Sequence, residues 1–231
     1  MEISEINSRF SIFRNIHQNK KGVIMGTGNS LNEYKRIPDA IHFGVNSVAQ
    51  HEHREILDYY LIADRNTSQS TYIDRNTNKG KQEILNLKCI KLFGIFKHAN
   101  TLWKNRDNIC LTEQDVLDNS AIKYEIGCRK RGTFPKLVKD LDVYCFGGFQ
   151  SVIWYALQFA LFTGINELYI VGCDLDDTNY GKGKPNKSSH LFKMWVEAKK
   201  FIEKEYTNVK VIIVNPRRLA ALFPNHIYTQ I

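Results

Sequence analysis

Residues 22–33 read GVIMGTGNSLNE and contain the residue types that most directly suggest a ligand site. Residues 23–25 suit a buried strand, and Gly26 and Gly28 would let backbone N–H groups approach a phosphate or sugar. We expect Asn29 and Ser30 to cap a following helix. The third glycine of the dinucleotide fingerprint would fall at Leu31. The stretch therefore predicts a strand-to-helix turn, Gly26, Thr27, Gly28, Asn29 and Ser30, either around a mononucleotide or without a ligand.

A second candidate is the acidic end of residues 167–174, ELYIVGCD, whose continuous apolar run predicts a central strand. Asp174 and Asp176 provide hard oxygen ligands at a spacing that could hold a divalent cation. The alternative is that Asp176 caps a loop and that Asp174 accepts a backbone hydrogen bond. We favour this alternative for the metal, so the sequence predicts no cofactor, although a divalent cation stays possible.

His190 is the candidate proton acceptor. It begins an amphipathic pattern over residues 190–206 that predicts a helix, and the positive end of that helix would keep its imidazole neutral and available as a general base. The preceding residues 176–189 are rich in Gly, Lys, Asn and Ser and contain Tyr180, so we expect a flexible lid loop. A histidine at a helix start can also be structural.

Two further polar residues end predicted strands. Asn46 lies within residues 41–48 and Asp64 ends residues 59–64. Ligands bind at the carboxyl edge of a parallel sheet, so either side chain could contact a ligand or merely cap a loop. An amide at Asn46, where a dinucleotide enzyme would have an acid, argues against NAD.

The pattern of apolar runs predicts one α/β domain over residues 1–231. We expect a Rossmann-like, doubly wound and mostly parallel sheet with helices on both faces. Residues 21–64 form its nucleotide region and residues 65–145 a variable insertion. Further strands are predicted at residues 89–95, 108–112 and 209–214, and helices at residues 149–163 and 219–223.

The composition limits the partners and the cellular location that we expect for the protein. A net charge of +8 favours anionic partners, and five cysteines without a C-x-x-C pair indicate neither a disulfide framework nor a zinc site. The longest apolar run, residues 152–162, contains Gln158 and is too short to span a bilayer. The sequence predicts a cytoplasmic protein and leaves open peripheral association with the inner face of the membrane and a homo-oligomer.

Four stretches, in order, resemble the bacterial CMP-sialic-acid-dependent lipooligosaccharide sialyltransferases, glycosyltransferase family 42. They are GTGNSLNE, FGVNSV, GGFQSVIWYALQFALFTGINELYIVGCDL and SSHLFKMWVEAKKFIEKEYTNVKVIIVNP. The likeness covers residues 21–224 and is weakest over residues 65–144. It implies a Rossmann-like fold that binds CMP-sialic acid without needing a metal, a lid over the donor, and a histidine base.

The resemblance assigns roles residue by residue. It implies that His190 is the general base of an inverting transfer of sialic acid, or a related acidic sugar, to a hydroxyl of a cell-surface glycan or glycolipid such as lipooligosaccharide. Asn46 matches a nucleotide-binding asparagine, Thr27 replaces another, and Ser151 lies near a family serine. Asp176 stands where the family has a tyrosine that stabilises the leaving phosphate, and Tyr180 could match a second one.

Two other functions remain open from the sequence. One is a metal-dependent relative of the pterin diphosphokinase or motility-accessory kind, which would use ATP or another nucleotide and would make Asp174 and Asp176 metal ligands. The other is a non-catalytic nucleotide-binding protein. No recognisable RNA- or DNA-binding motif occurs, so nucleic acid is not an expected partner.

Overall fold

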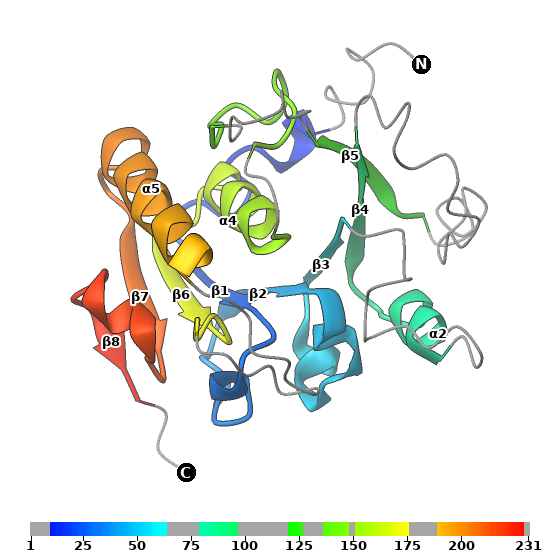
Figure 1. Cartoon of the computed structure of the whole chain (residues 1–231). Helices are drawn as coiled ribbons and strands as arrows, with labels where there is room; N and C mark the ends of the chain where they lie inside the picture. The colour runs from blue at the N-terminus through cyan, green and yellow to red at the C-terminus, as the bar shows by residue number, and fades with distance from the viewer. Residues whose placement is uncertain are drawn as a thin grey trace.

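The computed structural model of this chain describes residues 10–63, 79–96, 120–126, 136–147, 151–175 and 189–228 (Figure 1). Within them one eight-stranded sheet has the order β5-β4-β3-β2-β1-β6-β7-β8, and every strand pair is parallel. The strands are β1 Lys21–Met25, β2 Ala40–Val45, β3 Tyr59–Ile62, β4 Ile90–Phe96, β5 Ile122–Ile126, β6 Glu167–Val171, β7 Lys210–Val214 and β8 His226–Ile227.

The strand order is that of a doubly wound sheet. The chain builds outward from β1 to β5 and then returns to place β6 on the other side of β1. This reversal is the topological switch point, where open α/β sheets bind their ligands outside the carboxyl ends of the strands. The predicted α/β class and doubly wound architecture are confirmed, and the described sheet is entirely parallel.

Helices and turns cover both faces. Helices α4, Ile153–Phe162, and α5, Ser189–Glu205, contribute to the apolar cluster on one face. The other face is packed by α2, Lys79–Leu85, and by the short 3₁₀ turns η2, Asn29–Leu31, and η3, Asn46–Gln50. The remaining 3₁₀ turns are η1 Ser11–Phe13, η4 Glu52–Ile56 and η5 Arg218–Ala221. Figure 1 shows α4 and α5 side by side above the sheet.

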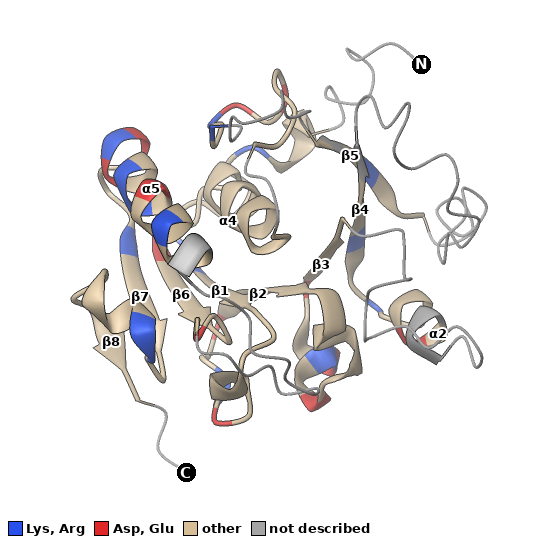
Figure 2. Ribbon diagram, in the orientation of Figure 1, with Lys and Arg blue, Asp and Glu red and all other residues tan. Residues whose placement is uncertain are grey.

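Helix α4 is buried along its whole length, as its apolar sequence predicts. Phe159 lies at its centre and makes edge-on ring contacts with Phe13 at 5.3 Å and Tyr59 at 5.2 Å between centroids. Helix α5 is amphipathic instead. Trp195, Ala198 and Ile202 are buried, while lysines and glutamates alternate over its outer side (Figure 2).

Gln158 is the polar exception within α4. Its side chain is fully buried, and its Oε1 accepts hydrogen bonds from the amides of Val138 at 2.9 Å and Gly147 at 3.1 Å. Its Nε2 donates to the carbonyls of Gly147 and Trp154, both at 2.8 Å. One amide side chain thus fastens residues 136–147 onto α4, since buried backbone groups require partners.

The structure differs from the sequence prediction at several elements. The helix expected after Ser30 is only the 3₁₀ turn η2, whose N-cap is Gly28, a residue without a capping side chain. The Ser30 hydroxyl, expected as a cap, bonds Asp174 instead. The helix expected at residues 219–223 is also a 3₁₀ turn, η5. Strands β5 and β8 were not predicted: β5 mixes charged and apolar residues, and β8 has two residues. The strand predicted at residues 108–112 lies outside the described residues.

No helix in the part of the chain that the structure describes is both long and apolar enough to cross a bilayer.

Candidate functional site

The carboxyl ends of β1, β2 and β6 form the edge at the switch point. Met25, the last residue of β1, pairs with Gly44 of β2 and with Val171 of β6. The turns that follow these strands, residues 26–30, the residues after 45 and residues 172–175, therefore start beside one another. This brings the predicted glycine turn and the acidic strand end together.

Ser30 and Asp174 fix these two turns to each other. Both residues are buried. One Asp174 carboxylate oxygen accepts the Ser30 amide at 2.8 Å and the other accepts the Ser30 hydroxyl. The same hydroxyl oxygen accepts the amide of Gly172 at 2.9 Å. Both carboxylate oxygens are thus engaged within the protein, which agrees with the structural alternative for Asp174.

The glycines of the turn are required by this close packing. The Gly26 amide donates to the Val171 carbonyl at 2.8 Å, and the Gly28 amide donates to the Gly172 carbonyl at 2.7 Å. A Cβ on Gly28 would lie 2.6 Å from an Asp174 carboxylate oxygen. Two amides that the sequence offered to a phosphate are therefore used inside the protein. Thr27 and Asn29 belong to the same turn.

Asn46 directly follows β2, next to β1 in the sheet. Its backbone is left-handed, with φ of +50°, and its carbonyl accepts the Tyr60 hydroxyl at 2.7 Å. Its side-chain Oδ1 is buried without a hydrogen-bond partner among the described residues. Buried polar atoms without partners are rare and call for an explanation, such as a ligand group. Asn46 is the one predicted donor-binding residue that shows this signature within the described part of the chain.

The predicted catalytic residues are located only in part. Helix α5 begins at Ser189, so the His190 backbone lies in its first turn as expected, but the side chain of His190 lies outside the described residues. Tyr180, Asp64, Asp176 and the lid loop also lie outside them. Ser151 precedes α4, and its carbonyl accepts the Trp154 amide at 3.2 Å.

The first halves of α4 and α5 meet through two tryptophans. The rings of Trp154 and Trp195 make an edge-on contact with 4.6 Å between centroids. Trp154 follows Ser151 by three positions, and Trp195 follows His190 by five. The starts of both helices therefore belong to one region of the molecule.

The end of β7 contributes a residue that the sequence prediction overlooked. Asn215 is buried, has a left-handed backbone, and donates from Nδ2 to the Ser30 carbonyl at 3.4 Å. The amide of Arg218 reaches the Asp174 carbonyl at 3.3 Å. A polar residue directly after a buried strand, VKVIIVN, was the available signal.

One group of potential metal ligands occurs among the described residues, His51, Glu52 and His53. It consists of the N-cap and the first two residues of η4 and not of residues at the Ser30–Asp174 contact. Both ring nitrogens of His51 are already used: Nε2 faces Asn32 Oδ1 at 3.0 Å, and Nδ1 accepts the His53 amide at 3.3 Å. Burial lowers the pKa of His51, which favours a neutral ring in these bonds.

No family model and no curated protein matches the chain. Two solved structures resemble it in fold. The sialyltransferase CstII from Campylobacter jejuni, in complex with the substrate analogue cytidine-5'-monophosphate, is 15% identical over 89% of this chain and 84% of its own, with a TM-score of 0.47. The MAf glycosyltransferase from Magnetospirillum magneticum AMB-1 is 10% identical over 92% of this chain and 37% of its own, with a TM-score of 0.46.

Proposed function

We propose that this protein is a glycosyltransferase that moves sialic acid, or a related acidic sugar, from a CMP-activated donor to a hydroxyl of a cell-surface glycan such as lipooligosaccharide. The proposal is supported by the four resembling sequence stretches and by the arrangement of the switch-point edge.

The observation that carries the proposal is Asn46. Its amide oxygen is buried directly after β2 without a hydrogen-bond partner in the described part of the chain, one strand from the glycine turn. An amino group of a base or a ribose hydroxyl would satisfy it. No carboxylate stands there to hold both ribose hydroxyls of a dinucleotide, so a CMP moiety fits this edge better than NAD.

His190 would take the proton of the acceptor hydroxyl. As the bond between the sugar and the phosphate breaks, CMP leaves with the bonding electrons and the sugar passes through an oxocarbenium-like state. The acceptor oxygen then forms the glycosidic bond while its proton passes to the imidazole. In the first turn of α5, the positive end of the helix dipole would favour the neutral form of this imidazole. Tyr180 would donate a hydrogen bond to the departing phosphate.

We propose that no metal is required. The two Asp174 carboxylate oxygens already accept hydrogen bonds from Ser30, so coordination of a cation would disrupt the contact between the two turns. A chelator should therefore leave transfer unchanged. Loss of activity on chelation, together with stabilisation by ATP and not by CMP, would instead identify a metal-dependent relative.

The test is a thermal-shift screen of CMP, CDP, UDP, GDP, ATP and NAD, with and without magnesium, on three proteins. Wild type and the Asn86→Ala variant, which truncates an exposed asparagine elsewhere, should be stabilised by CMP. Asn46→Ala should bind CMP about 5–10-fold more weakly, because one hydrogen bond contributes roughly 1 kcal/mol. Equal CMP affinity in both variants would remove Asn46 from the site.

A further inference from the structure

A groove of about 680 Å³ runs between α5 and residues 136–144. It is not formed by the predicted donor-binding residues. Its volume is in the usual range for a small-molecule site. Its floor is apolar, and the residues that form it are Leu137, Val138, Trp154, Met194 and Phe201.

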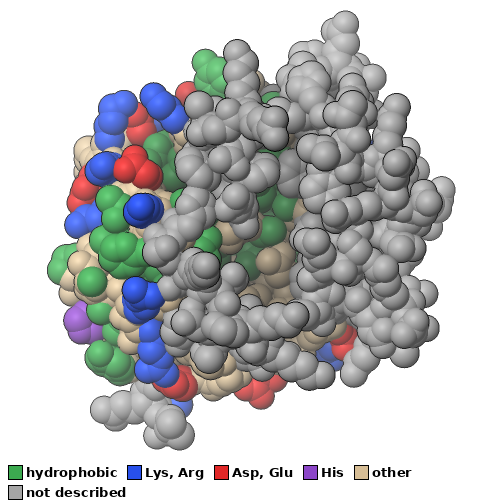
Figure 3. All heavy atoms as spheres, in the orientation of Figure 1, with side chains coloured by type: hydrophobic (Ala, Val, Ile, Leu, Met, Phe, Trp, Pro, Cys, Tyr) green, Lys and Arg blue, Asp and Glu red, His purple; other side chains and the backbone are tan. Residues whose placement is uncertain are grey.

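The rim of this groove is basic. Its lining includes five lysines and three carboxylates. Each carboxylate already has a cation: Asp140 pairs with Arg14, Glu197 with Lys200 and Glu205 with Lys204. The other three lysines, Lys136, Lys139 and Lys193, form no ion pair within the described residues. Figure 3 shows blue lysine side chains around hydrophobic atoms over this part of the molecule.

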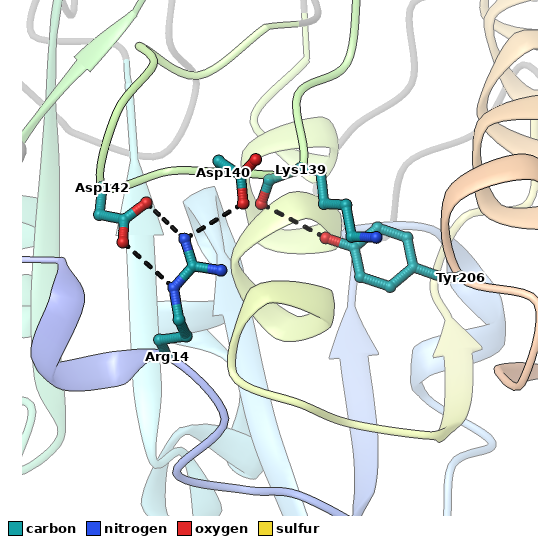
Figure 4. Close-up of polar contacts among 5 residues, drawn as sticks. All are labelled: Arg14, Lys139, Asp140, Asp142 and Tyr206. Carbon is teal, nitrogen blue, oxygen red and sulfur yellow. Dashed lines mark hydrogen bonds and ion pairs between the residues drawn. The ribbon is translucent and has the colours of Figure 1, made fainter.

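The wall opposite α5 is held in place. Gln158 fixes Val138 and Gly147 from below, and the Arg14 guanidinium bonds both Asp140 and Asp142, each through 3.1 Å contacts. These carboxylates raise the pKa of Arg14. Figure 4 shows the bonds from Arg14 to Asp140 and Asp142. It also shows the Lys139 ammonium beside the Tyr206 ring, 5.4 Å from its centroid. These hydrogen bonds and ion pairs hold residues 138–147 in place and so fix the shape of the groove.

Trp154 adds a polar group to the floor. It is 1% exposed, and its Nε1–H has no acceptor among the described residues. A ligand oxygen that reached the floor would satisfy this donor. An apolar floor, a buried N–H and a lysine rim together match a molecule that has a hydrocarbon chain joined to an anionic head.

We infer that this groove binds an anionic lipid of a membrane surface. The headgroup contacts Lys136 and Lys193, and the first part of the chain lies against Trp154, Met194 and Phe201. The inference goes beyond the proposed transferase activity. Its test measures binding without donor or acceptor, so either proposal can fail alone.

The first experiment measures co-sedimentation with vesicles of neutral phosphatidylcholine, with or without anionic phosphatidylglycerol. Wild type should bind only the anionic vesicles. Lys136→Gln/Lys193→Gln should bind about 30-fold more weakly, because each lysine near an anionic surface contributes roughly fivefold. The matched control is Lys35→Gln/Arg36→Gln, which removes the same charge from exposed positions outside the groove and should bind within about threefold of wild type.

The inference would be overturned if both double variants lost the same amount of vesicle affinity, since binding would then depend on overall protein charge and not on the groove. Equal binding of wild type to neutral and anionic vesicles would also overturn it.

A second experiment needs no variant. Wild type is titrated calorimetrically with inorganic phosphate and with hexyl, octyl and decyl phosphate as monomers. Affinity should rise about threefold to fourfold per added methylene that the floor buries. An affinity independent of chain length would show a simple anion site and contradict the groove assignment.

Discussion

Replacing Gln158 by leucine tests whether a single buried amide holds residues 136–147 on the helical layer. The change keeps the size and helix propensity of the residue but removes all four side-chain hydrogen bonds. Three buried or partly buried backbone groups, the Val138 and Gly147 amides and the Gly147 carbonyl, lose their partner. At roughly 1–3 kcal/mol for each unsatisfied group, less the gain from a more apolar core, we expect the free energy of unfolding to fall by about 3–6 kcal/mol.

The matched control is Thr163→Val in the same helical segment. Thr163 is equally buried, but its hydroxyl bonds only the Ala160 carbonyl one turn back, so its loss should cost about 1 kcal/mol. Urea unfolding gives both free energies, and hydrogen exchange measures the protection of residues 136–147. If the two variants are equally stable and residues 136–147 keep wild-type protection, Gln158 does not fasten this segment.

Two further predictions concern the turn and the pH dependence. Gly28→Ala should destabilise the protein by about 1–3 kcal/mol, because its Cβ would lie 2.6 Å from the Asp174 carboxylate. Gly22→Ala, whose Cβ would meet only the Ile165 side chain at 2.9 Å, should cost less; the reverse order in urea unfolding would show that the turn can relax. Burial lowers the pKa of His17 from 6.5, so the unfolded chain binds protons more readily than the folded one, and stability falls as the pH drops below that value. His17→Gln should reduce the difference between urea midpoints at about pH 7.5 and about pH 5.5; an unchanged difference would assign the pH dependence to other groups.

The central sheet and its two main helices could be predicted because each has a strong pattern. Continuous apolar runs identify β1 and β6. Apolar residues at nearly every position identify α4 as a buried helix, and an apolar residue at every third or fourth position identifies α5. Strand β5 could not be predicted, since Lys123 and Glu125 interrupt its apolar residues. Ser30 does not act as the expected helix cap because a long-range contact with Asp174 uses its hydroxyl, and no local pattern reveals a partner 144 positions away.

The fold brings the predicted glycine turn and acidic strand end to one edge of the sheet, but the contacts that each residue makes there could be found only from the tertiary structure. The sequence suggests Gly28 as a phosphate-binding glycine. In the fold its amide donates to the Gly172 carbonyl, and a Cβ there would collide with Asp174, so contacts with the segment after β6 account for the glycine. Asn46 could be singled out as a polar residue at a strand end, and only the fold shows that its Oδ1 is buried and has no partner within the residues that the structure describes. Gln158 was visible as a polar residue in an apolar helix, but its partners were not.

The central claim is that the switch-point edge binds a CMP-activated sugar and that His190 performs the transfer. The most direct measurement compares wild type and His190→Ala for CMP-dependent thermal stabilisation and for sugar transfer from CMP-sialic acid. At a hundredfold excess over its dissociation constant, CMP contributes about 2.7 kcal/mol, which should raise the melting temperature of both proteins by about 5–10 °C. Transfer should be lost in His190→Ala alone. No stabilisation of wild type by CMP, or undiminished transfer by the variant, would contradict the claim.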